Sequence, residues 1–176
     1  MPNSFKLPGS DTSMSIGGFI RADFQYDFDM NSDTPRNDGT FLFSQIPLDG
    51  SADARRDGEF RFVSRNTGLT IATSTPSEFG EIATVLSIDF VSGTGNELTE
   101  NGFIPELKEA YGTIGPLLAG QTVSTFSDVT SYPTTVDFFG PVGEPSVYQA
   151  LIRYTQDLGD GLVEKLALEN PETTGI

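Results

Sequence analysis

The sequence predicts an all-β fold built from antiparallel strands. Apolar and polar residues alternate with period two in several segments, as they do where a strand has one apolar and one polar face. Turn-forming Gly and Pro, 19 and 11 of the 176 residues, separate these segments. No segment shows a sustained helical period. The length fits one ordinary domain or a piece of a larger one.

The charge balance and two missing residue types exclude several functions. The chain has 10 Lys and Arg against 25 Asp and Glu, which gives a net charge of −15. Without a basic surface to neutralise phosphates, it is not expected to bind nucleic acid. It contains no Cys and no His, so cysteine nucleophiles, Ser-His-Asp triads and the common zinc sites are absent. We expect no cofactor, no metal site and no catalytic residue.

The first two predicted strands carry charged residues on their polar faces. The first, Ile16–Phe28, is apolar on its even-numbered face, and the opposite face carries Arg21, Asp23 and Asp27. In the second, Gly58–Thr73, the parity of the apolar residues changes between Phe62 and Leu69. That change predicts a bulge near residues 66–68 or a different strand boundary.

Five further segments complete a set of seven predicted strands. In the third, Ile82, Thr84, Leu86, Ile88 and Phe90 share one face. These five strands are Glu81–Phe90, Glu106–Thr113, Leu117–Phe126, Tyr148–Asp157 and Leu162–Asn170.

The connections between the predicted strands alternate in length. Long connections cover residues 29–57, 91–105 and 127–147, and short ones lie around residues 75–77, 114–116 and 158–161. Such alternation is typical of an up-and-down transmembrane β-barrel with long loops at one rim and short turns at the other. The charge-free stretch Ala110–Ser127 is long enough for a membrane helix, but its Gly and Pro residues argue against one. A membrane barrel needs no such apolar run.

Aromatic residues gather near both ends of the predicted strands, where a barrel places its interfacial girdles. A general preference of strands for aromatic residues is the alternative explanation. The aromatic residues near the long loops are Tyr26, Phe28, Phe60, Phe62, Phe90, Phe126 and Tyr148, and those near the short turns are Tyr111 and Tyr154.

Six short blocks, in order along the chain, resemble the DcaP-like family of Gram-negative outer-membrane porins. The blocks are SFKLPGSDTS (4–13), IGGFIRAD (16–23), LAGQTVSTF (118–126), TVDFFGP (135–141), LIRY (151–154) and LENP (168–171). The resemblance implies a trimeric, sixteen-stranded barrel in the outer membrane that passes small anionic solutes, dicarboxylates among them. The chain departs from the family pattern at Gly68, where an arginine is expected, and at Val123, where a tryptophan is expected.

Compared with that family, the chain holds about half of the expected strands. No signal peptide or periplasmic helical segment precedes the first block. We therefore expect residues 1–13 to form an extended N-terminal segment and residues 14–176 to form the N-terminal part of a larger barrel. The expected surroundings are outer-membrane lipid, small anionic solutes and, at full length, two further copies of the protein.

Charged residues on the polar strand faces are the predicted pore lining, because a pore selects solutes by charges of the opposite sign. Arginine suits an anionic solute, because it binds a carboxylate through two parallel hydrogen bonds. Arg21, Arg61 and Arg65 are predicted to form a basic ladder that Asp23 and Asp27 face. The alternative is that these residues are an ordinary solvated strand face. The complete predicted lining is Arg21, Asp23, Asp27, Arg61, Arg65, Lys108, Arg153 and Glu169.

Two loops receive an interpretation of their own. The loop 127–147, with Asp137, Phe138 and Phe139, either folds into the lumen as a constriction or packs against the barrel wall or a neighbouring subunit. The acidic residues of the loop 29–57 form a solvated rim or, alternatively, bind divalent cations. Asp157–Gly161 resembles a calcium loop but lacks its terminal Glu, and is predicted to be a turn.

Two other classes of function compete with the porin. A secreted β-sandwich that binds a ligand such as carbohydrate has a similar composition, but it would bury its apolar strand faces, whereas a barrel turns them outward. An enzyme would need an acid–base pair or a nucleophile, and no spacing singles one out.

Overall fold

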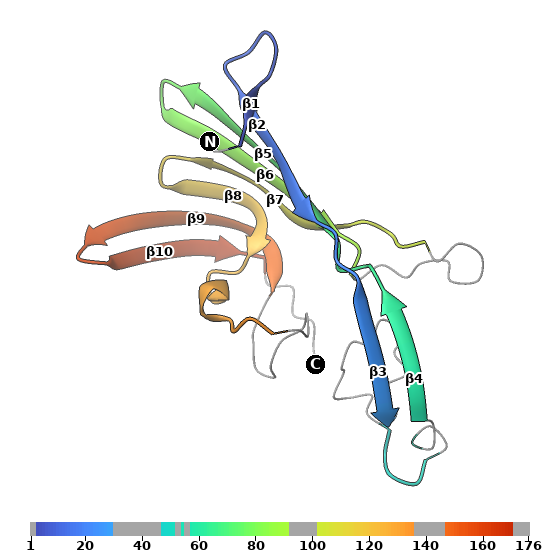
Figure 1. The fold of residues 1–176 in the computed structure, drawn as a ribbon. Helices are drawn as coiled ribbons and strands as arrows, with labels where there is room; N and C mark the ends of the chain where they lie inside the picture. Colours follow the sequence, from blue (N-terminus) through green and yellow to red (C-terminus); the bar gives the residue numbers. More distant parts are fainter. Residues whose placement is uncertain are drawn as a thin grey trace.

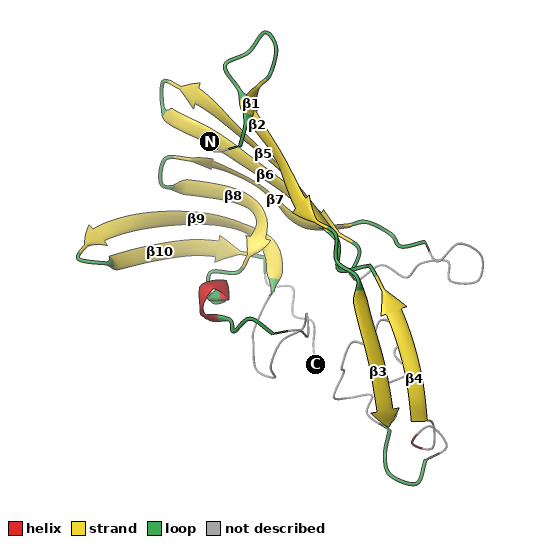
Figure 2. Ribbon diagram, in the orientation of Figure 1, coloured by secondary structure: helices red, strands yellow, loops and turns green. Residues whose placement is uncertain are grey.

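The protein is built almost entirely from β-strands, as the alternation predicts (Figures 1 and 2). The computed structural model describes residues 3–29, 47–51, 54, 57–91, 102–135 and 147–170. The strands are β1 (Phe5–Lys6), β2 (Ser13–Phe19), β3 (Asp23–Asp29), β4 (Asp57–Val63), β5 (Gly68–Ser77), β6 (Gly80–Asp89), β7 (Glu106–Ile114), β8 (Leu117–Val123), β9 (Tyr148–Gly159) and β10 (Leu162–Glu169). The described residues include no α-helix, and η3 (Val129–Ser131) is a short 3₁₀ turn.

Eight strands form one antiparallel, curved sheet in the order β1-β2-β5-β6-β7-β8-β9-β10, and β3 and β4 form a separate two-stranded sheet. The short turns lie at one end of the large sheet and the long connections at the other (Figure 1). The sheet is open, with β1 and β10 at its edges. This is the architecture of an up-and-down barrel wall that has not closed on itself.

Each of the first two predicted strands is interrupted. Ile16–Phe28 is divided between β2 and β3, and Gly58–Thr73 between β4 and β5. Phe19 pairs with Gly68 before the interruption and Asp23 pairs with Val63 after it, so three residues on one chain segment oppose four on the other. The extra residue explains the parity change in the sequence, because it returns the apolar side chains of both segments to one face.

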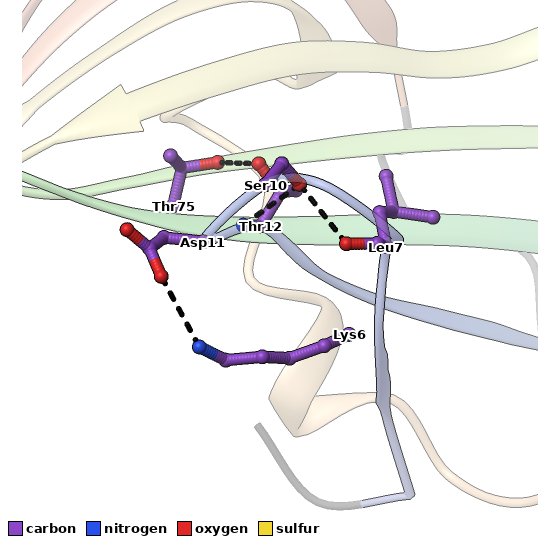
Figure 3. Close-up of polar contacts among 6 residues, drawn as sticks. All are labelled: Lys6, Leu7, Ser10, Asp11, Thr12 and Thr75. Carbon is purple, nitrogen blue, oxygen red and sulfur yellow. Dashed lines mark hydrogen bonds and ion pairs between the residues drawn. The ribbon is translucent and has the colours of Figure 1, made fainter.

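The N-terminal segment lies along the sheet edge. β1 pairs with β2, and the turn between them is closed by the Leu7 amide, which donates to the Thr12 carbonyl at 2.9 Å. The Lys6 ammonium contacts Asp11 at 3.2 Å, and the Thr12 and Thr75 hydroxyls are 2.9 Å apart (Figure 3). These contacts attach the expected extended segment to β2 and β5.

The two faces of the large sheet differ in the way that a membrane barrel requires. Pairing places Ile16, Ile71 and Leu86 in one row, and Ile16 and Leu86 are 58% and 43% exposed. By contrast, the buried residues of the described chain are mostly polar. They are Arg61, Arg65, Asp89, Thr122, Ser124, Val63, Val91 and Leu151. A sandwich would bury the isoleucines of the large sheet, so their exposure matches the barrel and not the sandwich.

The structure changes one predicted strand end and contains one predicted turn. β8 ends at Val123 instead of the predicted Phe126, because the chain turns after Ser124, with the Ser127 amide donating to the Ser124 carbonyl at 3.0 Å. The turn predicted at Asp157–Gly161 is present, and the Gly159 amide donates to the Asp157 carboxylate at 2.8 Å. In the part of the chain that is described, no helix has the length and apolar character to cross a bilayer.

Candidate functional site: the polar face of the sheet

Hydrogen-bonding side chains run across the face opposite the exposed isoleucines, which we call the polar face. Thr70 and Ser87 hydroxyls on β5 and β6 are 3.2 Å apart, and the Thr122 hydroxyl on β8 donates to Glu109 on β7 at 2.7 Å. On the next strands, Gln149 donates to Glu169. These side chains satisfy one another's hydrogen-bonding groups, on a face that would be a packed apolar core in a soluble β-sandwich.

The interruption of the first two strands contains the first charged cluster. Arg21 Nε donates to Asp23 at 2.7 Å, and both side chains are a little more than a quarter exposed. Asn66 donates to the second Asp23 oxygen at 2.8 Å, and the Arg21 amide donates to the Thr67 hydroxyl at 3.3 Å. Asp23 therefore lies beside Arg21 and offsets its charge, and the arrangement of Asp23 opposite the other arginines of the ladder stays a prediction.

Arg61 and Arg65 are the most deeply buried basic residues in the described part of the chain. Arg61 lies on β4 opposite Gln25 and is 6% exposed. Arg65 lies in the interruption, is 2% exposed, and its guanidinium is 4.7 Å from the centre of the Phe103 ring. A buried guanidinium over an aromatic ring is a stable arrangement because the ring face attracts the cation.

Lys108 on β7 is held by two partners. Its ammonium is 3.2 Å from the Asp89 carboxylate and 5.3 Å from the centre of the Tyr148 ring. The register between β6 and β7 shifts between Ser87, which pairs with Glu109, and Ile88, which pairs with Leu107. Lys108 is therefore the extra residue of a β-bulge. Tyr148 thus belongs to a charged cluster at the long-loop end. Tyr111, paired with Val85 and Gly120, lies on the polar face, so it is not a lipid-facing girdle residue as the sequence suggested. For Tyr148 the girdle position stays a prediction.

Glu169, at the end of β10, is hydrogen-bonded to other parts of the chain. Its carboxylate accepts hydrogen bonds from the Ser124 hydroxyl at 2.7 Å, from the Thr125 amide at 2.8 Å and from Gln149. These bonds fix the point where the chain leaves β8 and enters the long connection before β9. Glu169 therefore has a structural role, and its place in the pore lining stays a prediction.

Arg153 on β9 has a different environment from the other arginines. Its pairing neighbours are Leu118 and Ala167, and its Nε is buried without a hydrogen-bond partner among the described residues. Lys165 on β10 pairs with Thr155 and lies on the same face. The sequence analysis missed Lys165, although Leu166 and Leu168 on the opposite face indicate its orientation.

Several predicted residues are only partly described, or not described. Asp27 pairs with Glu59 in the β3–β4 hairpin. Asp137, Phe138 and Phe139 lie outside the described residues, so the constriction loop stays a prediction. At the start of that loop, the Thr130 hydroxyl and amide donate to Asp128 and lower the pKa of its carboxyl.

The described residues contain no group of three or more acidic side chains arranged to hold a metal ion. Most of the acidic loop 29–57 lies outside the described part of the chain, so neither interpretation of that loop is tested.

One solved structure has the same fold over nearly the whole chain. It is the outer membrane channel DcaP of Acinetobacter baumannii, with a TM-score of 0.73 and 22% sequence identity over 97% of this chain. The match covers 46% of the DcaP chain, so this sequence spans somewhat less than half of the length of that channel.

Comparison with curated protein sequences gave no match. The family profile described as "Porin subfamily" (Porin_2) matches residues 3–176. Porins are channels of the outer membrane and catalyse no reaction, so the protein is an outer-membrane protein and not an enzyme. Together with the exposed apolar face and the charged polar face, this match shows that the chain belongs to the Porin subfamily.

Proposed function

We propose that the protein forms a passive diffusion channel for small hydrophilic anions, dicarboxylates among them, and that it assembles as a trimer at full length. One observation carries the preference for anions. Three charged side chains are buried among the described residues: Arg61 and Arg65 are basic, and Asp89 is paired with Lys108. In a barrel of this family, the polar face lines the water-filled interior.

Arg61 and Arg65 are the residues expected to influence ions most strongly. Because both are buried, their charges are less screened by water than those of exposed residues. Such charges attract an anion by their field even where the guanidinium does not touch it. The acidic partners of Arg21 and Lys108 offset part of the positive charge of those two residues.

The test replaces Arg61 and Arg65 together by Gln in the protein at its natural full length. The permeability ratio of succinate over potassium is measured from reversal potentials in a planar bilayer, and we expect it to fall by about tenfold or more. The charge-preserving R61K/R65K double variant is the control, and it should retain most of the preference. An unchanged ratio in R61Q/R65Q, with conductance intact, would show that these arginines only neutralise neighbouring acids.

A further inference from the structure

We propose that one face of the β3–β4 hairpin is a docking surface for a second copy of this chain in the assembled channel. This proposal rests on the proposed trimer, and it names a surface through which the subunits meet beyond the lipid. We call this surface the aromatic face. It consists of Phe24, Tyr26, Phe28, Phe60 and Phe62.

Strand pairing gathers these five rings on one side of the hairpin. Phe24 pairs with Phe62, and Tyr26 pairs with Phe60. The ring centres of Phe24 and Phe62 are 4.6 Å apart, and the rings of Tyr26 and Phe28 meet edge to face with their centres 5.0 Å apart. The rings therefore form one contiguous apolar surface.

The aromatic face is exposed in the single chain, since its five side chains are between 52% and 79% exposed. At about 200 Å² for each aromatic side chain, the exposed area is roughly 600 Å². The largest apolar patch on a typical monomer is about 300–600 Å², and each partner contributes about 800 Å² to a standard protein interface. The aromatic face is thus large enough to carry most of a specific contact between proteins.

Lipid does not reach the far end of this face. β5 and β6 have ten residues each, which is the length that a tilted strand needs to cross the hydrocarbon layer. The hairpin continues beyond the large sheet at the end of the long connections (Figure 1). Its strands of seven residues add about 16 Å of height at a tilt of about 45°, whereas the headgroup layer is about 5–8 Å thick. Phe28, near the hairpin tip, therefore extends past the interfacial layer.

Charge disfavours anionic lipid as the partner and allows a second copy. The two strands of the hairpin carry five acidic residues and one arginine, and the acidic residues alternate with the rings. Anionic headgroups are repelled by such a segment. A second copy presents the same uncharged rings, because in a trimer the same surface of each copy can face the threefold axis. Contact between rings then places apolar groups at the centre of the interface.

The direction of the hairpin is fixed where the strands are interrupted. The Asp23 carboxylate accepts hydrogen bonds from Arg21 Nε at 2.7 Å and from Asn66 at 2.8 Å. The Thr67 hydroxyl donates to the Ser64 carbonyl at 2.8 Å and accepts from the Arg21 amide at 3.3 Å. These bonds join the two chain segments from which the hairpin starts. A surface that is already held in one orientation loses less conformational entropy when it binds a partner.

The test uses the protein at its natural full length in lipid vesicles. The share of trimer is measured by chemical cross-linking while the ratio of protein to lipid is lowered. We expect F28S/F60S to raise the dissociation constant of the trimer by about tenfold for each ring removed. The matched control is F79S/F126S, which replaces two exposed phenylalanines outside the hairpin and should leave the trimer intact.

A second measurement does not depend on how well the double variant folds. The 176 residues contain no Cys, so F28C introduces a single thiol into this part of the protein. A short bismaleimide should join copies of F28C to one another. F126C places an equally accessible thiol after β8, outside the aromatic face, and should give no such product.

The outcomes separate the docking surface from the proposed trimer. If the protein is a trimer, but F28S/F60S and F28C behave like their controls, the trimer stands and the docking surface is refuted. If the unmodified protein is a monomer in vesicles, both are refuted. An equal loss of trimer in F79S/F126S would also refute the surface. So would quenching of a fluorophore on F28C by brominated acyl chains, because lipid would then cover the rings.

Discussion

Replacing Gly120 by Ala is expected to destabilise the sheet strongly. Gly120 lies on β8 between Tyr111 and Leu151, and its φ of +135° is one that side-chain-bearing residues rarely adopt. A Cβ atom at this position would lie 2.3 Å from the Ala110 carbonyl oxygen and 2.5 Å from the Tyr111 Cα. Both atoms belong to the neighbouring backbone, so they cannot move aside without shifting β7.

The size of the effect follows from two costs. Overpacking in a fixed environment costs about 1–3 kcal/mol, and a non-glycine residue in such a backbone conformation costs about 1–3 kcal/mol more. We therefore expect G120A to lower the free energy of unfolding by about 2–6 kcal/mol. A relaxation of the strand toward ordinary extended geometry would lower this figure and flatten the curve of the sheet.

Gly112 on the adjacent strand provides a matched control. A Cβ there would meet the Ala83 carbonyl oxygen at 3.6 Å, which is an ordinary contact, and its φ is not in the positive range. Gly17 and Gly18 form a second pair of the same kind, since a Cβ at Gly17 meets nothing within 4 Å but one at Gly18 lies 2.2 Å from the Gly68 carbonyl oxygen. G112A and G17A should change stability by less than about 1 kcal/mol.

The assay is urea unfolding of the full-length protein in lipid vesicles, followed by far-ultraviolet circular dichroism. The midpoints of G120A and G18A should fall well below those of G112A and G17A. Equal midpoints for Gly120→Ala and Gly112→Ala would refute the reasoning, because they would mean that the close approach at Gly120 is not a constraint on the fold.

Two further predictions concern the long loop and the isolated chain. E169A should increase the rate of chymotrypsin cleavage between residues 124 and 147 by about tenfold or more, because it removes the three hydrogen bonds that Glu169 accepts. E164A on the same strand should leave the rate unchanged. The 176-residue chain expressed alone should aggregate without detergent in size-exclusion chromatography and form no channel, since its open sheet has two unpaired edges and an exposed apolar face. A monodisperse soluble monomer with a cooperative melt would contradict that expectation.

The sequence alone determined the class of fold and most of the strands. Period-two alternation depends only on neighbouring residues, so it identified β6 and β7 within a residue or two and assigned Ile16 and Leu86 to the apolar face. The alternation of long and short connections likewise predicted which strand ends lie at each rim. These features are local because a strand exposes successive side chains on opposite faces whatever its partners are.

Only the tertiary structure decided which charged residues act together. Asp23 lies beside Arg21 because an extra residue between β4 and β5 brings Asn66 and Thr67 to the same point, and no spacing along the chain shows this. Glu169 binds Ser124, which is 45 residues away in sequence, because β8, β9 and β10 are neighbours. Whether a charge is neutralised or left for a solute depends on cross-strand register, and register is set by pairing between distant segments. For the same reason the sequence analysis named Arg153 but missed Lys165, and only the pairing of β9 with β10 places both on the same face of neighbouring strands.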